Sequence, residues 1–119
     1  VSTVFIETVP HNRLSTYLNQ SRIFVLPSYL EGHPKVLLEA MSCSLPVIVS
    51  DIQAHRSIVN KGNGILTKLD QSEIAKHLLK TLRDTKHMKV LGKAARAEIV
   101  KNYSMKKLNA LEIRVLKKI

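Results

Sequence analysis

The sequence predicts a three-layer α/β domain in which a parallel sheet of about four strands carries helices on both faces and is followed by a helical tail. Two patterns support this fold class. Short apolar runs alternate with segments of helical periodicity up to residue 71, and only helical patterns follow. The chain has 119 residues, of which 45% are apolar, so it is long enough for one domain with a single core, residues 1–119.

Four short apolar runs are expected to form the strands. The first covers residues 3–6 and stops before a proline. The second, residues 23–28, is apolar on both faces, which is typical of a central parallel strand. The third covers residues 47–50, and the fourth covers residues 65–67 after a Gly-Asn-Gly turn signal. The sequence therefore predicts a sheet made mainly from the first half of the chain.

Helical spacing of apolar residues predicts the segments between these strands. Helices are expected at residues 11–21, 34–44, from 72 onward, 86–103 and 105–119, with a short helix or turn at 54–60. The helix at 34–44 is apolar nearly all round and should be buried. Ser72 is the expected N-cap of its helix, whose inward side chains would be Ile74, Leu78, Leu79 and Leu82. Residues 86–119 form the predicted helical tail.

The loop at residues 27–34 is the most informative segment for function. The strand–helix alternation is Rossmann-like, and such sheets bind ligands at the carboxyl ends of their strands. This loop follows the second strand and leads into the apolar helix, whose first N–H groups and positive dipole end can hold an anion such as a phosphate. Gly32 lets a ligand approach the backbone closely, and Glu31 stands at the mouth of the loop.

A second carboxylate, Glu39, lies inside the apolar helix and needs a reason, because an unpaired buried charge is costly. One interpretation is an ion pair with Lys35 four residues earlier, worth a few tenths of a kcal/mol. The other is a carboxylate that accepts two hydrogen bonds from the hydroxyls of a sugar or a ribose. The spacing alone leaves both interpretations open.

The segment PSYLEGHPKVLLEAMSCSLPVIVSDIQAHRSIV resembles the signature region of family-four glycosyltransferases, which are retaining enzymes of the GT-B fold. The shared pattern is a Pro-Ser strand end, a Glu, seven residues, a second Glu, then Ala-Met and a Pro-Val strand. Glu31 and Glu39 have this spacing, and the likeness extends from Val4 to Ser104. The resemblance implies part of a GT-B C-terminal domain.

The resemblance also implies a role for each residue of the motif. The first Glu of the family lies beside the donor sugar and diphosphate and contributes to catalysis, so Glu31 takes that place. The second Glu grips the ribose, so Glu39 takes that role. The intervening backbone touches sugar and phosphates, so the implied donor-binding residues are Glu31, Gly32, His33, Pro34, Lys35, Val36 and Glu39. The donor would be a nucleoside-diphosphate sugar, with no metal ion and no further cofactor.

The chain also departs from the family pattern. Ser44 stands where the family usually has glycine, Ser57 where it often has glutamate, and His33 where an apolar or aromatic residue is usual. The basic pair that neutralises the donor diphosphate and the acceptor-binding N-terminal domain would lie upstream of these residues. We therefore expect an incomplete donor-binding domain that transfers no sugar alone and works with an N-terminal acceptor domain.

The net charge of +10 is concentrated in the helical tail, because residues 86–119 hold ten basic and two acidic side chains. This charge could attract an anionic membrane surface, and it could equally be a solvated helical face. Only 4% of residues are aromatic, so stacking platforms for nucleic-acid bases are largely lacking and no nucleic-acid partner is expected. The single Cys43 is expected to be a buried thiol in a reducing compartment.

The sequence thus predicts the donor-binding part of a retaining glycosyltransferase that acts on a glycan, a lipid-linked molecule or another acceptor. The location would be cytoplasmic, with peripheral contact to the inner face of the membrane. The alternative is a non-catalytic glycosyltransferase-like module that binds a partner through its basic helices. The histidines at 11, 33, 55, 77 and 87 show no metal-ligand spacing.

Overall fold

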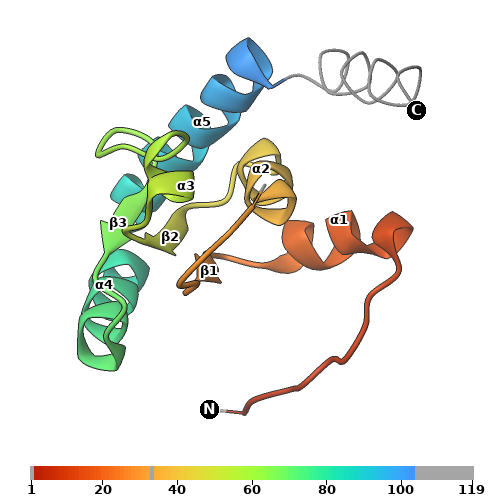
Figure 1. Cartoon of the computed structure of the whole chain (residues 1–119), viewed down its shortest axis with the longest axis horizontal. Coiled ribbons are helices and arrows are strands. Elements are labelled where there is room, and N and C mark those ends of the chain that lie inside the picture. The colour runs from red at the N-terminus through yellow and green to blue at the C-terminus, as the bar shows by residue number, and fades with distance from the viewer. Residues whose placement is uncertain (1, 33, 104–119) are drawn as a thin grey trace.

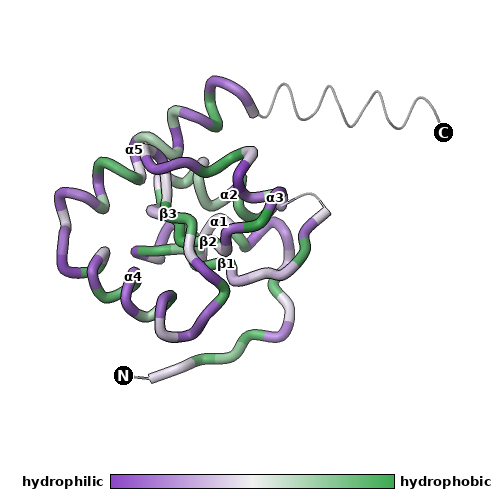
Figure 2. The backbone as a smooth tube through the Cα atoms, turned by 60° about the vertical axis from the view of Figure 1, so that its left-hand side comes forward, coloured by the Kyte–Doolittle hydropathy of each residue, from purple (hydrophilic) through white to green (hydrophobic). Residues whose placement is uncertain are grey.

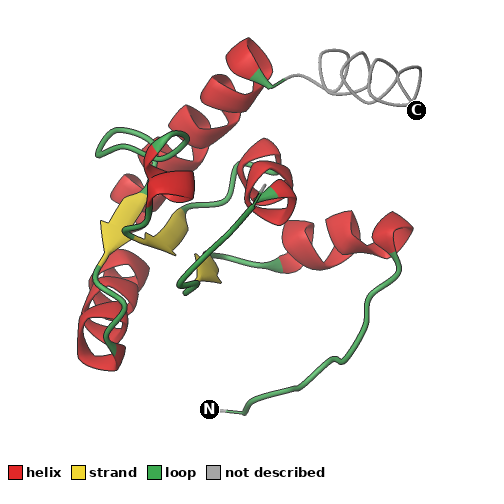
Figure 3. Cartoon of the chain, viewed as in Figure 1, coloured by secondary structure: helices red, strands yellow, loops and turns green. Residues whose placement is uncertain are grey.

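Three short parallel strands form the sheet in the order β1-β2-β3 (Figures 1 and 3). They are β1 (Phe24–Leu26), β2 (Val47–Ser50) and β3 (Ile65–Thr67). Phe24 pairs with Val47 in the first ladder, and Ile48 pairs with Ile65 in the second. The computed structural model describes residues 2–32 and 34–103 of the chain. The predicted parallel sheet is therefore confirmed, with three strands in place of about four.

The central strand is β2, which lies between the other two. All four of its residues are buried, and successive side chains of a strand point to opposite faces, so both faces of the sheet are covered. The prediction of strands at 47–50 and 65–67 is confirmed. The strand predicted within residues 23–28 is confirmed by β1, but its predicted central position is wrong, because β1 lies at an edge of the described sheet and is only half-buried.

The expected strand at residues 3–6 is also wrong. Residues 2–10 contain no helix or strand, and Val4 and Phe5 are 78% and 92% exposed. Figure 1 shows this segment running apart from the sheet before it reaches the first helix. A strand needs a neighbour to which its backbone can hydrogen-bond, and the described residues place none beside this one. Its apolar composition alone was an insufficient signal.

In the part of the chain that the structure describes, five helices surround the sheet: α1 (His11–Gln20), α2 (Lys35–Ser42), α3 (Gln53–Arg56), α4 (Gln71–Arg83) and α5 (Thr85–Asn102). Each corresponds to a predicted helical segment, and α3 begins one residue before the short helix or turn predicted at 54–60 and covers only its first three residues. The predicted helix at 105–119 lies outside the described residues. Among the described residues, no helix is long and apolar enough to cross a bilayer.

The core is built around α2, which packs against α1 on one side and α5 on the other. Because α2 meets helices and strands on several sides, its apolar residues are buried nearly all round, as predicted. The main cluster also contains side chains from α1, from β2, from α5 and from the loop that follows α3. Its buried members are Leu18, Leu37, Leu38, Ala40, Met41, Leu45, Val47, Val49, Ile58, Val59, Ala95 and Ile99.

Two expectations for α4 are wrong. Its N-cap is Asp70, whose carboxylate accepts a hydrogen bond from the Glu73 backbone N–H at 3.4 Å, and Ser72 lies inside the first turn. Leu79 is 53% exposed, although it was expected to face inward. The helix packs through one narrow stripe against β2, β3 and α5, and Leu79 lies beside that stripe, whose members Ile74, Leu78 and Leu82 are half-buried.

The end of α2 forms a Schellman motif. The Ser44 N–H donates to the Met41 carbonyl at 3.1 Å, and the Leu45 N–H donates to the Ala40 carbonyl at 3.3 Å. Ser44 accordingly has a φ of 61°, in the left-handed region. Glycine enters this region without steric cost, whereas a residue with a Cβ atom is strained there.

A Ser44→Gly variant is therefore expected to be more stable. The gain should be about 0.5–1 kcal/mol, because the relief of strain exceeds the extra freedom of glycine in the unfolded chain. Thermal unfolding monitored by circular dichroism checks this, with Ser72→Gly in the first turn of α4 as a control that should be destabilised. An unchanged or lower midpoint for Ser44→Gly would contradict the expectation.

Candidate functional site

The candidate site lies at the carboxyl ends of β1 and β2, where the loop at residues 27–34 leads into α2. Four residues of this loop line a surface pocket of 430 Å³, and the other wall comes from α3 and the residues beside it. This volume is within the range of small-molecule sites. The lining residues are Tyr29, Leu30, Glu31, Gly32, Ile52, Gln53, Ala54 and Ser57.

Glu31 is half-buried and held by its own loop. The Ser28 hydroxyl donates a hydrogen bond to Glu31 Oε1 at 2.8 Å. Gly32 is exposed, and a Cβ atom built on it would meet nothing within 4 Å. A ligand in this pocket could therefore approach the Gly32 backbone directly while meeting a carboxylate whose orientation is fixed.

The amino end of α2 follows two residues later, with Pro34 as its N-cap. Pro34 is buried and carries no side-chain group that could accept from the first amides of the helix. The helix dipole gives this end a partial positive charge, which favours an anion there. Lys35 is exposed and Val36 is half-buried at this end. His33 lies outside the described residues.

Glu39 is placed differently from the sequence expectation. Its side chain is 26% exposed, so it is half-buried and not buried as predicted. Glu39 Oε1 lies 3.8 Å from Nδ1 of His11, the first residue of α1, whose side chain is 74% exposed. A long ion pair in which one partner is well exposed contributes little stability. Glu39 thus faces α1 and does not line the pocket that contains Glu31.

The structure therefore brings Glu31 and Gly32 into one pocket and places Pro34, Lys35, Val36 and Glu39 along the adjoining helix. Sequence reasoning missed the opposite wall of the pocket, including Gln53 and Ser57. A signal for it was present, because the loop after the next parallel strand must reach the same edge of the sheet.

Other candidate residues stay outside the site. Cys43 was expected to be a buried thiol; it is half-buried at the end of α2 and packs against the core. Within the described ranges 2–32 and 34–103, no group of three His, Cys, Asp or Glu side chains could hold a metal ion.

Comparison with known proteins gives consistent matches. The family described as "Glycosyl transferases group 1" matches residues 1–98. A UDP-Gal:alpha-D-GlcNAc-diphosphoundecaprenol alpha-1,3-galactosyltransferase of Escherichia coli is 35% identical over 97 residues, which are 81% of this chain and 25% of that protein. An O-antigen chain mannosyltransferase B of Escherichia coli is 34% identical over 76 residues, 64% of this chain and 20% of that protein. The chain thus spans a quarter or less of these relatives.

Solved structures share the fold. A sucrose-phosphate synthase from Thermosynechococcus elongatus matches 97% of this chain and 29% of its own, with a TM-score of 0.83 and 24% identity. The Anabaena protein HepE, in complex with UDP and glucose, matches 89% of this chain and 30% of its own, with a TM-score of 0.77 and 22% identity.

Proposed function

Because the chain belongs to the glycosyl transferases group 1 family and has the fold of a GT-B C-terminal domain, we propose that it binds the nucleotide-sugar donor of a retaining glycosyltransferase. The acceptor would be a glycan, a lipid-linked molecule or a related compound. The observation that carries the proposal is the pocket lined by Glu31 and Gly32 beside the amino end of α2. The names of similar proteins, which mention UDP-Gal, UDP and UDP-glucose, support this choice of donor.

In this proposal the donor extends from the pocket along the start of α2. The sugar lies in the pocket against Glu31 and Gly32, where Gln53 and Ser57 offer polar groups to its hydroxyls. The diphosphate lies over the amino end of α2, where the helix dipole and the amides near Pro34 meet its charge. The ribose hydroxyls reach Glu39, whose side chain is partly exposed and therefore accessible to a ligand.

The same arrangement would assist the transfer. Charge develops on the departing diphosphate as the bond to the sugar breaks, and dipoles already pointing at that position stabilise it. Glu31 would touch the reacting sugar and diphosphate, and His33 is proposed as a further donor-binding residue on the resemblance alone. We propose that neither a metal ion nor a further cofactor is needed. The acceptor would be held by an N-terminal domain across the cleft.

A titration tests this proposal. We expect saturable binding of UDP-glucose, UDP-galactose or GDP-mannose to the 119-residue chain by calorimetry, with weaker binding of the free sugars. We also expect no sugar transfer by this chain alone, because only one wall of the cleft is present to position the reactants. If the full-length protein binds no nucleotide sugar, the proposed function is contradicted. Measured transfer by the 119 residues would contradict the proposal that a separate N-terminal domain must hold the acceptor.

The helices α4 and α5 support a proposal about location. Lys86, Lys89 and Lys93 recur at helical spacing on α5 and are exposed, and Val90 beside them is 60% exposed. Figure 2 shows hydrophilic residues along most of α4 and α5, interrupted by apolar ones. We propose that this α5 lysine stripe meets anionic lipid at the inner face of the membrane, with the protein otherwise in the cytoplasm. One relative is named for a diphosphoundecaprenol-linked acceptor.

Vesicle flotation checks this expectation. Binding to vesicles with anionic lipid should be weak, reversible and lost at high salt, and each well-placed lysine should contribute about 1 kcal/mol. Replacing Lys86, Lys89 and Lys93 with Gln should reduce it, whereas replacing the exposed Lys61 and Lys68 should reduce it less. Equal flotation with neutral and anionic lipid would contradict the proposal. Vesicle binding without nucleotide-sugar binding would favour the alternative of a non-catalytic module.

A further inference from the structure

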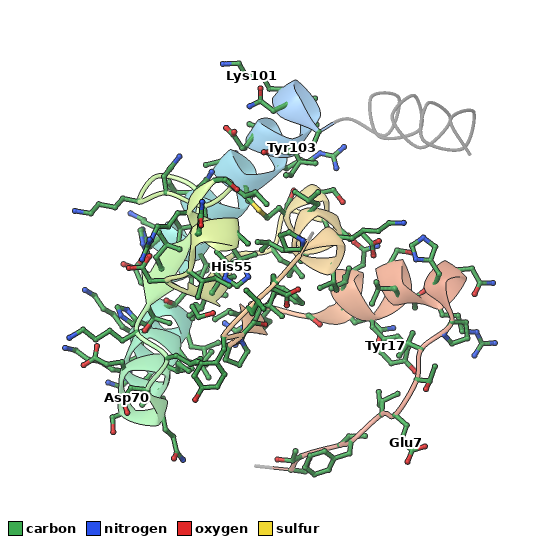
Figure 4. All side chains as sticks on the ribbon, viewed as in Figure 1. Glu7, Tyr17, His55, Asp70, Lys101 and Tyr103 are labelled. Atoms are coloured by element: carbon green, nitrogen blue, oxygen red, sulfur yellow. The ribbon has the colours of Figure 1, made fainter. Side chains whose placement is uncertain are left out.

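His55 is a fully buried histidine that the proposed donor site does not use. It lies in the short helix α3 and is 0% exposed, and Figure 4 labels it near the middle of the molecule. Its Nδ1 is 2.8 Å from the carbonyl oxygen of Ser50 and 3.4 Å from Ser50 Oγ. A carbonyl oxygen only accepts, so Nδ1 carries the proton and donates.

The other ring nitrogen has no corresponding role. Nε2 is buried and has no hydrogen-bond partner among the described residues. A leucine of similar size would fill the same space without burying an unpaired nitrogen. Packing alone therefore does not account for a histidine at this position, and the donor at Nδ1 is the feature that a leucine would lack.

His55 donates to Ser50, whose side chain connects the carboxyl ends of β1 and β2 through two hydrogen bonds to Ser28. We call this pair of bonds the Ser50–Ser28 clamp. Ser50 is the last residue of β2 and is 1% exposed. Its hydroxyl donates to the Ser28 carbonyl at 2.5 Å and accepts from the Ser28 N–H at 2.9 Å. The ladder between β1 and β2 ends at the pair Leu26 and Val49, so the Ser50 side chain continues the pairing beyond the last backbone bond.

Ser28 in turn holds the carboxylate of the site. Its backbone N–H and carbonyl are both hydrogen-bonded to the Ser50 hydroxyl, and its own hydroxyl donates to Glu31 Oε1 at 2.8 Å. A continuous chain of hydrogen bonds thus runs from the buried ring of His55 through Ser50 and Ser28 to Glu31 in the pocket. Of these links, the one between Ser50 and Ser28 joins segments 22 residues apart in sequence, the end of β2 and the loop after β1.

We propose that His55 is a positioning residue: by donating from Nδ1 to Ser50 it holds the Ser50–Ser28 clamp, and through it the orientation of Glu31 toward the donor. The inference rests on the proposed function, because it assigns Glu31 to the sugar and diphosphate of a nucleotide sugar. A carboxylate that is free to rotate would lose part of its interaction with a bound donor, since supporting hydrogen bonds set the geometry of a site.

The test compares variants that keep or remove this donor in the full-length protein. His55→Asn retains an N–H close to the Nδ1 position, and His55→Leu fills the space without a donor. Ser50→Ala removes the clamp itself, and Glu31→Gln serves as the reference. The ligands are UDP-glucose and GDP-mannose, with UMP and GMP as matched probes that lack the sugar and the second phosphate.

We expect His55→Leu and Ser50→Ala to weaken nucleotide-sugar binding about tenfold and to leave binding of the monophosphates nearly unchanged. His55→Asn should bind nearly as well as the wild type, a rescue that a purely packing role would not produce. If His55→Leu does not fold, the other two variants still test the positioning role: Ser50→Ala should weaken nucleotide-sugar binding, and His55→Asn should retain it.

Wild-type affinity in folded His55→Leu, wild-type affinity in Ser50→Ala, or loss of affinity in His55→Asn equal to that in His55→Leu would overturn the positioning role. If Glu31→Gln weakens binding while His55→Leu does not, this inference fails and the proposed function stands. If the wild type binds no nucleotide sugar, UDP-galactose included, both fail.

Discussion

A Glu39→Gln variant of the full-length protein is expected to bind its nucleotide-sugar donor about ten- to a hundredfold more weakly than the wild type. A hydrogen bond to a charged group is worth roughly 1.5–3 kcal/mol, which corresponds to this loss. The substitution keeps the size of the side chain and one acceptor oxygen but removes the charge that would bind two ribose hydroxyls. Calorimetric titration with the donor measures the effect.

Stability should change much less than affinity in this variant. The interaction of Glu39 with His11 is long, at 3.8 Å, and half of the pair is well exposed, so its loss should cost only a few tenths of a kcal/mol. Glu73→Gln is the matched control, because Glu73 is also a helical glutamate beside a histidine, 4.0 Å from His77. Unchanged donor affinity in Glu39→Gln, or an equal loss in Glu73→Gln, would contradict the ribose-binding role.

A Gly92→Ala variant is expected to lose about 3 kcal/mol of folding stability. A methyl group at Gly92 would overlap the backbone carbonyl oxygen of Ser44, where α5 crosses the end of α2. Backbone cannot rotate away as a flexible side chain does, so the two helices must separate, and overpacking of this kind is costly. Arg96 donates to the Ser42 carbonyl at 2.5 Å, and this bond would be strained as well.

Helix propensity and the close contact with Ser44 predict opposite changes in the stability of the Gly92→Ala variant. Alanine is the better helix former by about 1 kcal/mol, so propensity alone predicts that Gly92→Ala stabilises the protein. Contact with Ser44 predicts a fall of roughly 10 °C or more in the melting temperature. Gly32→Ala is the control, because a Cβ atom there meets nothing within 4 Å and stability should change little. A higher melting temperature for Gly92→Ala would contradict the close packing of α5 on α2.

The helices were largely predictable because their signals are local. The periodicity of apolar residues gave the positions of α1, α2 and α5, and the stop after α2 was visible in the proline that follows. The exact ends of a helix are harder to predict where two nearby residues could both serve as the N-cap. Asp70 and Ser72 are both good N-caps, and the packing of the helix decides in favour of Asp70.

Strand pairing was less predictable, because it depends on partners distant in sequence. Residues 3–6 have the apolar composition of a strand, yet the segment stays exposed where no strand lies beside it. The segment around β1 is apolar enough for a central strand, yet the sheet places it at an edge. The apolar composition of a segment indicates that it can be buried, but it does not indicate which other element will pack against it.

The candidate site shows the same division. Glu31 and the amino end of α2 were predictable from the loop sequence and its resemblance to a known motif. The opposite pocket wall from α3, and the link from His55 through Ser50 to Ser28, join residues more than twenty positions apart. The degree of burial of Glu39 depended on α1, whose position beside α2 only the structure provides.

In the proposed function, a nucleotide-sugar donor binds across the pocket and the start of α2. A crystal structure of the full-length protein with the nucleotide sugar selected by titration tests it most directly. We expect the sugar beside Glu31 and Gly32, the diphosphate at the amino end of α2, and the ribose hydroxyls within hydrogen-bond distance of Glu39. A nucleotide sugar bound elsewhere, with this pocket and Glu39 untouched, would contradict it.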